Sequence, residues 1–325
     1  MKNNHHITRR ESLKKLLKIS SGIAMSGFLP LSCKSDQRET DDRETDHRKL
    51  VPLNQEKFIA EGVGQTKNYS IKALTRKVFD AAGGIGKFIS KGDVVVIKPN
   101  ISWARAPHLA ATTNPEVIQA VVELCQEAGA QKVRIVDNTI HDAQRCFAIT
   151  GVGAVAKKTG ADLVVPRESL MKDMNLHGHR LDVWPVFTPI IEADKLINLP
   201  VAKDHGLSVL TLGIKSWIGA VGGRRSALHQ DIHQTIVDLA QFFKPTVTLI
   251  DATRIMINNG PSGGNASDVR VKNRLFLSND PVAADTKAST LFDLDPDELG
   301  FIHLADKWGL GTKDFSQLKQ LKVAV

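Results

Sequence analysis

Short apolar runs alternate with helix-patterned stretches along most of this 325-residue chain, and no other feature constrains its fold as strongly. The runs are rich in β-branched residues and lie at residues 94–97, 133–136, 163–165, 196–199, 247–250 and 275–277. Helical patterns cover residues 115–128, 144–158, 208–218, 232–243 and 282–291. This alternation predicts an α/β fold, in which helices flank a mainly parallel sheet.

Polar side chains stand where the predicted strands end. They include Lys98, Asn100, Asp137, Lys203, His205 and Asp251. Because ligands of open parallel sheets bind beyond the carboxyl ends of the strands, we expect these side chains to converge on one site. The alternative interpretation is that they are ordinary polar loop residues.

The charges at this edge indicate an anionic ligand or cofactor. A buried ammonium at Lys98 would be costly unless it were paired or faced a ligand. Lys203 and Lys215 would add to the same positive pocket, although Lys215 could instead be exposed on a helix. The hydroxyls of Thr112 and Thr113 precede the helix at 115–128, whose N-terminus also favours anions.

Compared with His229 and His233, His205 is the better candidate for a general acid or base, because it lies between Asp204 and Gly206 in a predicted strand-end loop. We therefore assign catalytic roles to His205, Lys98 and Asp251. The expected ligand-binding residues are Asn100, Thr112, Thr113, Asp137, Lys203 and Lys215.

A metal site is the alternative for the histidines. His229 and His233 are four residues apart and would share a helix face, with His205, Asp137 and Asp251 as further ligands. The intervening residues lack the glutamate of the zinc-protease motif, and loop or cap histidines explain the pattern equally. We predict no metal.

Other cofactors lack their usual motifs. Residues 83–87 resemble a phosphate-binding loop but precede a strand, and residues 151–156 follow a helical pattern where a dinucleotide fingerprint needs a strand. Only Cys33, Cys125 and Cys146 are present, too few for the four ligands of an iron–sulfur cluster. Cys125 is expected to pack as a small hydrophobe, and a disulfide with Cys146 stays open. The cofactor is unknown.

Residues 258–265 form either a ligand-covering flap or a long turn.

The first 33 residues resemble a twin-arginine export signal. Arg9 and Arg10 precede a modest apolar stretch, residues 19–31, which is too short to span a membrane. Cys33 follows and is either a lipid-attachment site or an incidental cysteine. Residues 34–50 are almost entirely polar and suit a disordered tether. We expect a signal at 1–33, a tether at 34–50, an α/β domain at 51–325, and a location in the cell envelope with a lipid anchor on Cys33.

The positive charge of the chain belongs mainly to this signal. Residues 1–33 hold six cations and one acid, a net +5 of the total +8, which leaves +3 for the rest. Aromatic residues make up only 5% of the chain, and no basic stripe carries interleaved aromatics. Nucleic acid is therefore excluded as a partner.

An ordered set of short motifs resembles the domain of unknown function 362 family. They are GDVVVIKPN at 92–100, TTNPEV at 112–117, INLP at 197–200, GIKS at 213–216, NGP at 259–261, DPVAAD at 280–285 and GLG at 309–311. The resemblance covers roughly residues 55–315 and implies an α/β domain without a settled reaction. Some members are fused to ferredoxin-like cysteine motifs, which implies a redox partner protein, but this chain lacks those cysteines.

Two function classes follow. The first is an exported, redox-associated enzyme that binds an anionic small molecule at the strand ends. The second is a non-catalytic envelope protein that binds a ligand or assists the maturation of a partner. A titratable His205 beside Lys98 and Asp251 would favour catalysis, whereas a pocket of Lys, Asn and Thr alone would favour binding.

Overall fold

The structure is a computed structural model that describes residues 56–66 and 68–325. The expected export signal, Cys33 and the tether at 34–50 lie outside the described residues. Among the residues that are described, no helix combines the length and apolarity needed to cross a membrane.

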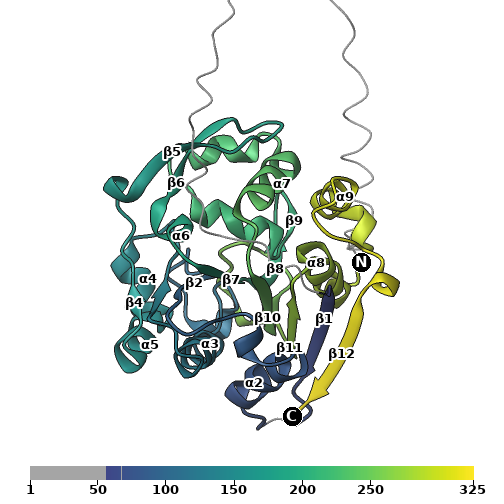
Figure 1. Cartoon of the computed structure of the whole chain (residues 1–325). Helices are drawn as coiled ribbons and strands as arrows, with labels where there is room; N and C mark the ends of the chain where they lie inside the picture. The colour runs from purple at the N-terminus through teal and green to yellow at the C-terminus, as the bar shows by residue number, and fades with distance from the viewer. Residues whose placement is uncertain (1–55, 67) are drawn as a thin grey trace, which may run out of the picture. The chain divides into compact units, whose positions relative to one another are not determined.

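A ten-stranded mixed sheet forms the centre of the domain, and most of its strand pairs are parallel (Figure 1). Its main path is β12-β1-β11-β10-β7-β2-β3-β4, and β8 and β9 extend it beside β10. The strands are β1 (Phe58–Val63), β2 (Val94–Pro99), β3 (Lys132–Ile135), β4 (Asp162–Leu163), β7 (Lys195–Leu199), β8 (Val201–His205), β9 (Val209–Thr211), β10 (Val247–Met256), β11 (Val269–Ser278) and β12 (Lys319–Ala324). A separate antiparallel pair joins β5 (Met171–Asn175) to β6 (Val183–Phe187).

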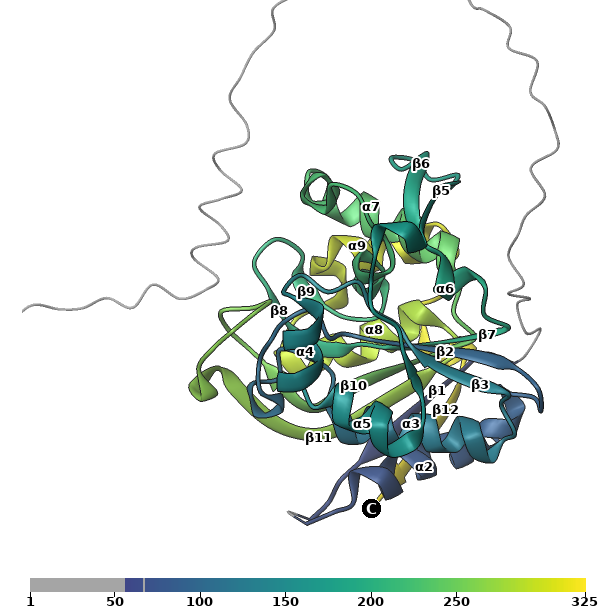
Figure 2. The same cartoon turned by 90° about the vertical axis from the view of Figure 1, so that its left-hand side faces the viewer.

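Helices cover both faces of the sheet (Figure 2). One face packs against α2 (Ile71–Ala81), α3 (Pro115–Glu127), α4 (Ala143–Ile149) and α5 (Val152–Thr159). The other face packs against α6 (Thr188–Ile191), α7 (Ile232–Phe243), α8 (Pro281–Ser289), α9 (Gly300–Lys307) and the 3₁₀ segment η4 (Ile214–Ala220).

Alternation along β2 shows how the sheet separates two apolar cores. Val95 and Ile97 belong to the core on the α3 side, whereas Val96 belongs to the core on the α7 side. Successive side chains of a strand point to opposite faces, so a strand that is covered on both faces must be apolar throughout. The run from Val94 to Ile97 satisfies this requirement, and the predicted α/β fold is confirmed.

Several strands and helices lie where the local sequence pattern predicted them. Strands occur at or within two residues of the predicted runs at 94–97, 133–136 and 196–199, and α7 has the predicted bounds. Helix α3 begins at Pro115, and the Asn114 side chain caps it by accepting a hydrogen bond from the Glu116 amide. Cys125 is fully buried in this helix, and both Cys125 and Cys146 are free.

Several predicted elements were wrong in extent, among them the strand expected at 275–277, which begins at Val269. The helix expected at 144–158 is two helices, because Gly151 adopts a left-handed φ of 80° between α4 and α5. The segment 208–218, expected to be helical, contains the strand β9 before η4 begins. The strand at 247–250 continues to Met256, so Asp251 lies inside β10 and does not end it.

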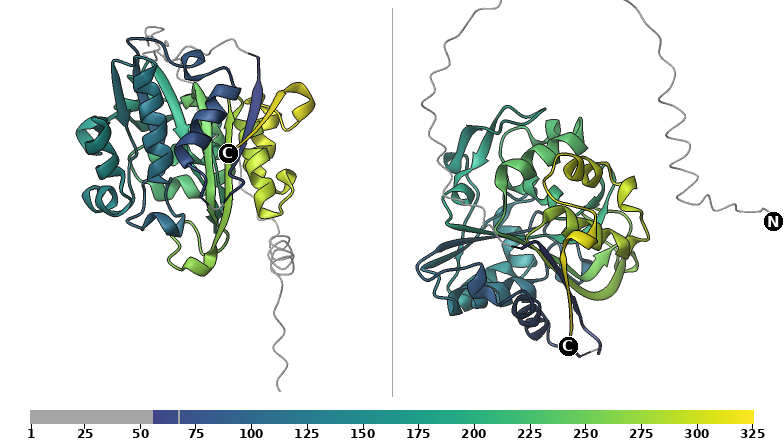
Figure 3. Two further views of the ribbon diagram at one scale, coloured as in Figure 1. Left: turned by 90° about the horizontal axis from the view of Figure 1, so that it is seen from below. Right: turned by 45° about the vertical axis from the view of Figure 1, so that its right-hand side comes forward.

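The end of the sheet formed by β12 and β1 was not predicted from the sequence. β1 pairs in parallel with β12, and β1 and β12 lie more than 250 residues apart in sequence (Figure 3). β8 was also missed, because Lys203 and His205 suggested a loop while they in fact lie in a buried strand. Pairing over such distances has no local sequence signal.

Candidate functional site

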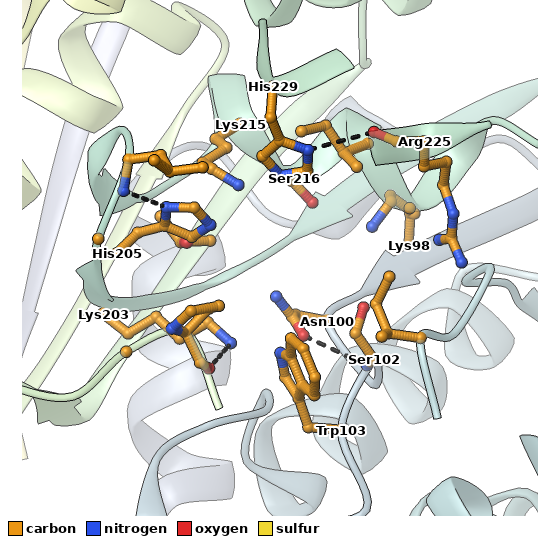
Figure 4. Close-up of a pocket in the computed structure, with 18 residues that line it drawn as sticks. Lys98, Asn100, Ser102, Trp103, Lys203, His205, Lys215, Ser216, Arg225 and His229 are labelled. Carbon is orange, nitrogen blue, oxygen red and sulfur yellow. Dashed lines mark hydrogen bonds between the residues drawn. The ribbon is translucent and has the colours of Figure 1, made fainter. Parts of the chain in front are cut away.

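A cavity of about 330 Å³ opens beside the carboxyl ends of β2 and β8 (Figure 4). Lys98 enters it from β2, Lys203 and His205 enter from β8, and Lys215 enters from η4. The 3₁₀ segment η5 (Arg225–His229) supplies both of its terminal residues, and the loop after β10 supplies Gly260 and Pro261. The structure therefore brings together residues from three separate regions of the sequence: β2, the stretch from β8 to η5, and the loop after β10.

Lys98 and Asp137 form a buried ion pair at the floor of this cavity. Lys98 Nζ lies 2.8 Å from Asp137 Oδ1, and each residue is only 1% exposed. Oδ2 of Asp137 accepts hydrogen bonds from the Ile101 amide at 2.8 Å and from the Ser102 hydroxyl at 3.3 Å. This carboxylate follows β3, so it fixes both the lysine and the loop that leaves β2.

Lys203 is tied to two backbone carbonyls. Its Nζ donates to the carbonyl oxygen of Ala111 and, at 2.8 Å, to that of Pro261. Burial, together with the charges of Lys215 and Lys98, lowers the pKa of Lys203 well below its usual value. The lysine thus joins the loop before α3 to the loop after β10.

The loop after β10 has further contacts over the cavity. The Gly260 amide donates to Asp204 Oδ2 at 3.0 Å, and Arg105 Nε donates to the Ser262 carbonyl oxygen at 3.2 Å. These contacts place the 258–265 segment at the cavity wall, where a ligand-covering flap would lie.

Lys215 is held in place through the start of η4. Both oxygens of Asp285 accept backbone hydrogen bonds there, from the Gly213 amide at 2.7 Å and from the Ile214 amide at 2.9 Å. Lys215 itself is 7% exposed, which excludes the exposed-helix alternative. Burial and the charge of Lys98 lower the pKa of Lys215 to about 7.

Two histidines face each other with nearly parallel rings. The centroids of His205 and His229 are 6.2 Å apart. Nδ1 of His205 accepts hydrogen bonds from the amides of Leu207 and Ser208, which assigns its proton to Nε2. Nδ1 of His229 lies 3.1 Å from the Arg225 carbonyl oxygen, so this nitrogen carries the proton and Nε2 keeps the lone pair.

Both imidazoles are neutral near pH 7. Burial and the charges of Lys215 and Lys203 lower the pKa of His205 to about 2. Burial and Lys215 also lower the pKa of His229. The two rings therefore offer one donor and one acceptor nitrogen that do not bond to the backbone.

Arg225 is a cavity residue that the sequence reasoning missed. Its Nη1 and Nη2 donate to the carbonyl oxygens of Asn138 and Thr139, at 2.6 and 2.7 Å. A guanidinium has five N–H donors, so others remain for a ligand. Trp103 was also missed, and it packs edge-on against His141 at the cavity wall. Neither residue belongs to a recognisable motif, so the sequence offered no signal for either.

Residues 95–290 match the family described as Domain of unknown function (DUF362), and they make up more than half of the chain. The chain belongs to this family. It is also 27% identical over 251 residues to the thylakoid-associated protein sll1697 of Synechocystis sp., covering 74% of this chain and 76% of that protein.

Two solved structures resemble this chain at lower sequence identity. The lactate racemase apoprotein from Thermoanaerobacterium thermosaccharolyticum aligns with a TM-score of 0.43 and 13% identity over 76% of this chain. A Thermotoga maritima protein aligns with a TM-score of 0.40 and 8% identity over 68% of this chain. The chain spans 58% and 59% of the lengths of these two proteins.

Four of the predicted site residues of this DUF362 member do not line the cavity: Asp137, Asp251, Thr112 and Thr113. Asp137 is paired with Lys98, which does line it. Asp251 Oδ2 accepts a hydrogen bond from the Asn114 amide at 2.8 Å, and its Oδ1 accepts two from Thr253. Thr113 Oγ1 donates to the Leu199 carbonyl oxygen at 2.8 Å. Thr112 is buried beside them. Asp251 and Thr113 thus anchor the start of α3.

The alternative metal ligands are dispersed. His233 stacks on Phe301 at 6.2 Å on the α7–α9 side, away from the other two histidines. Within residues 56–66 and 68–325, no three His, Cys, Asp or Glu side chains are grouped as metal ligands would be. Asn100 does line the cavity, and its Oδ1 accepts from the Ser102 amide.

Proposed function

We propose that this protein binds a small anionic molecule in the cavity between β2, β8 and η4. One observation carries the proposal: Lys98, Lys203, Lys215 and Arg225 surround about 330 Å³ of space, and Asp137 is the one carboxylate among the described residues that is paired with any of them. Buried cations are stable only when they are paired, hydrogen-bonded or deprotonated. A carboxylate or phosphate in the cavity would supply the missing negative charge.

The ligand class follows from the donors. Arg225 and Lys98 hold fixed positions through their protein contacts, so they are preorganised for an oxyanion. Trp103, Ile140 and Ile218 add apolar wall to the same space. A cavity of this volume is at the lower end of the range for small-molecule sites. A small carboxylate or phosphate ester with a short apolar part fits this combination.

The histidine pair favours an enzyme over a passive binding protein. Nε2–H of His205 can donate a hydrogen bond that polarises a carbonyl oxygen, as a neutral imidazole does, and Nε2 of His229 can accept a proton from a reacting group. The alternative, a non-catalytic envelope protein for ligand binding or partner maturation, needs no such pair. Asp251 lies outside the cavity, so the catalytic role predicted for it has no geometric support. A redox partner stays a prediction from the family resemblance.

Export and lipid attachment are proposals that rest on the sequence of residues 1–50. The Arg9-Arg10 pair, the short apolar stretch and Cys33 support them, and the Synechocystis sp. relative is named as thylakoid-associated. Cell fractionation of the full chain should find it in the envelope. The R9K/R10K variant should stay in the cytoplasm, and C33S should lose the membrane-bound fraction. Unchanged fractionation of both variants would contradict these proposals.

Anion binding is tested by calorimetry with acetate, phosphate and phosphoenolpyruvate on the purified chain. We expect saturable binding of at least one of these anions, weakened on the order of tenfold or more in the R225M variant, because a charge-assisted hydrogen bond contributes about 1.5–3 kcal/mol. Lys91→Met is the matched control, since Lys91 is exposed and outside the cavity. Equal affinity in R225M and the wild-type protein would contradict the proposal.

A further inference from the structure

Lys215 differs from the other two lysines of the cavity in the contacts of its amino group. Lys98 Nζ is paired with Asp137, and Lys203 Nζ donates to two carbonyl oxygens. Within the described part of the chain, Lys215 Nζ has neither a hydrogen-bond acceptor nor an ion-pair partner, although the residue is only 7% exposed. Figure 4 shows its side chain extending into the cavity beside His205 and His229.

These surroundings favour the neutral amine. Burial and the charge of Lys98 lower the pKa of Lys215 to about 7. About half of the amine is then neutral at pH 7, roughly 10³ times the fraction for an ordinary lysine of pKa about 10.4. A neutral lysine in a desolvated, cationic pocket is a nucleophile toward carbonyl groups.

The neighbouring groups complete what carbonyl chemistry requires. Arg225 and Lys98 can bind a carboxylate, which would orient a carbonyl carbon attached to it. Nε2–H of His205 can donate a hydrogen bond to a carbonyl oxygen and so polarise it, and Nε2 of His229 can accept a proton from the amine. The charge of Lys215 acts on both imidazoles, which places its amino group within electrostatic reach of each ring.

We propose that Lys215 forms a reversible Schiff base with a small 2-oxo acid whose carboxylate is bound by the neighbouring cations. This inference rests on the proposed anion site and deepens it by naming the substrate class. The lone pair of Nζ attacks the carbonyl carbon, a C–N bond forms, and the carbonyl π electrons move to oxygen. One amine proton passes to that oxygen and gives a carbinolamine. Loss of the hydroxyl as water, with the second amine proton, leaves the imine; no oxidant or reductant is consumed.

The test traps the imine by reduction. The purified full chain is incubated with pyruvate or glyoxylate and sodium cyanoborohydride, whose hydride converts the imine to a stable secondary amine. Peptide mass spectrometry then gives the adduct yield at each lysine. We expect the yield at Lys215 to exceed that at exposed Lys91 by on the order of tenfold or more, because far more of its amine is neutral. The adduct should disappear in both K215R and K215M.

Binding of anions that cannot form an imine distinguishes the Schiff-base proposal from the proposed anion site. Acetate and lactate have no carbonyl carbon that can form an imine, so their binding reports the anion site alone. Because K215R keeps the positive charge, acetate should still bind to it while trapping is lost. Anion binding with equal labelling of Lys215 and Lys91 would overturn the Schiff base and leave the anion site standing. Failure of every anion to bind would overturn the proposed function itself.

Discussion

Nζ of Lys98 lies 2.8 Å from Oδ1 of Asp137 in the interior of the domain, where only 2% and 0% of the two side chains are exposed. The pair joins β2 to the segment after β3, two neighbouring parallel strands. A buried ion pair need not stabilise a protein relative to an apolar pair, but a buried charge without its partner is costly. Removing either residue would therefore leave the other as an unpaired buried charge.

Replacing one member of this pair should destabilise the protein more than replacing both. We expect Lys98→Met to lower the free energy of unfolding by about 3–5 kcal/mol, because Asp137 is left buried without its cation. The K98M/D137N double variant should recover part of this loss, since an asparagine oxygen can still accept from the Ile101 amide. Urea unfolding of the three proteins measures the effect. Equal destabilisation by K98M and the double variant would show that the two residues are not coupled.

Gly219 is predicted to be intolerant of a methyl group. A Cβ at this position would collide with Asp137 Oδ1 and lie 2.9 Å from Lys98 Nζ. Gly219→Ala should therefore displace the ion pair, weaken anion binding and lower stability by about 1–3 kcal/mol. Gly206→Ala is the matched control, because Gly206 lines the same cavity but has open space where its Cβ would stand. Calorimetry and thermal unfolding should leave G206A near the wild-type values; a G219A protein that matched it would contradict the prediction.

Anion affinity should increase as the pH falls from 8 to 6. The pKa of Lys215 is lowered to about 7 in the empty cavity, so protonation adds a positive charge over this interval. The two imidazoles contribute little change over this interval, because His205 has a pKa of about 2 and burial lowers the pKa of His229 below its usual value. Lys98, Lys203, Arg225 and Asp137 also face the cavity or its floor. The K215R variant should flatten this pH dependence in calorimetry, and an unchanged slope would count against Lys215 as its source.

The same lysine should make the protein more stable as the pH rises, which is the opposite direction to its effect on anion affinity. Its folded-state pKa of about 7 lies below the unfolded value of 10.5, so the unfolded chain binds more protons between these limits. The free energy of unfolding therefore rises with pH through this window, and Lys215 contributes about 1–3 kcal/mol of that rise. Urea unfolding at pH 7.5 and 9.5 should show a smaller difference for K215M than for the wild-type protein.

Asp251 should prove structural. Its side chain accepts a hydrogen bond from the Asn114 amide at the start of α3 and two from Thr253. We expect Asp251→Asn to lower the free energy of unfolding by about 1–3 kcal/mol, because an amide nitrogen would replace one acceptor against buried donors. The acetate affinity of the folded fraction should stay at the wild-type value. Native stability with lost affinity would restore Asp251 to the site.

The local sequence specified those elements whose signals lie within a few residues. Asn114, Pro115 and the apolar periodicity of residues 117–125 fixed α3, because capping and helical packing depend on near neighbours. The four-residue run from Val94 to Ile97 marked a strand covered on both faces. Gly151 was visible in the sequence, yet whether a glycine interrupts a helix depends on the packing of α4 and α5, which the local pattern omits.

Only part of the candidate site could be predicted from local sequence signals. Lys98, Asn100, Lys203, His205 and Lys215 could be named because each is a polar residue in or after an apolar run. Arg225 and His229 could not be placed, because no local pattern indicates that both ends of η5 line the cavity. Asp251 gave the same polar signal as Lys98 and yet faces the start of α3. Residue type alone does not distinguish a ligand contact from an anchor.

The sequence by itself thus determined the α/β class, the covered strands and a concentration of lysines near the strand ends. The tertiary structure alone decided which of those residues share a cavity, because β8, η4 and η5 meet there through contacts that span more than a hundred residues from Lys98. It also decided that Lys98 has a carboxylate partner whereas Lys215 has none among the described residues. The physical reason is that burial and pairing, which set the charge of a lysine, are properties of the packed chain and not of its neighbours in sequence.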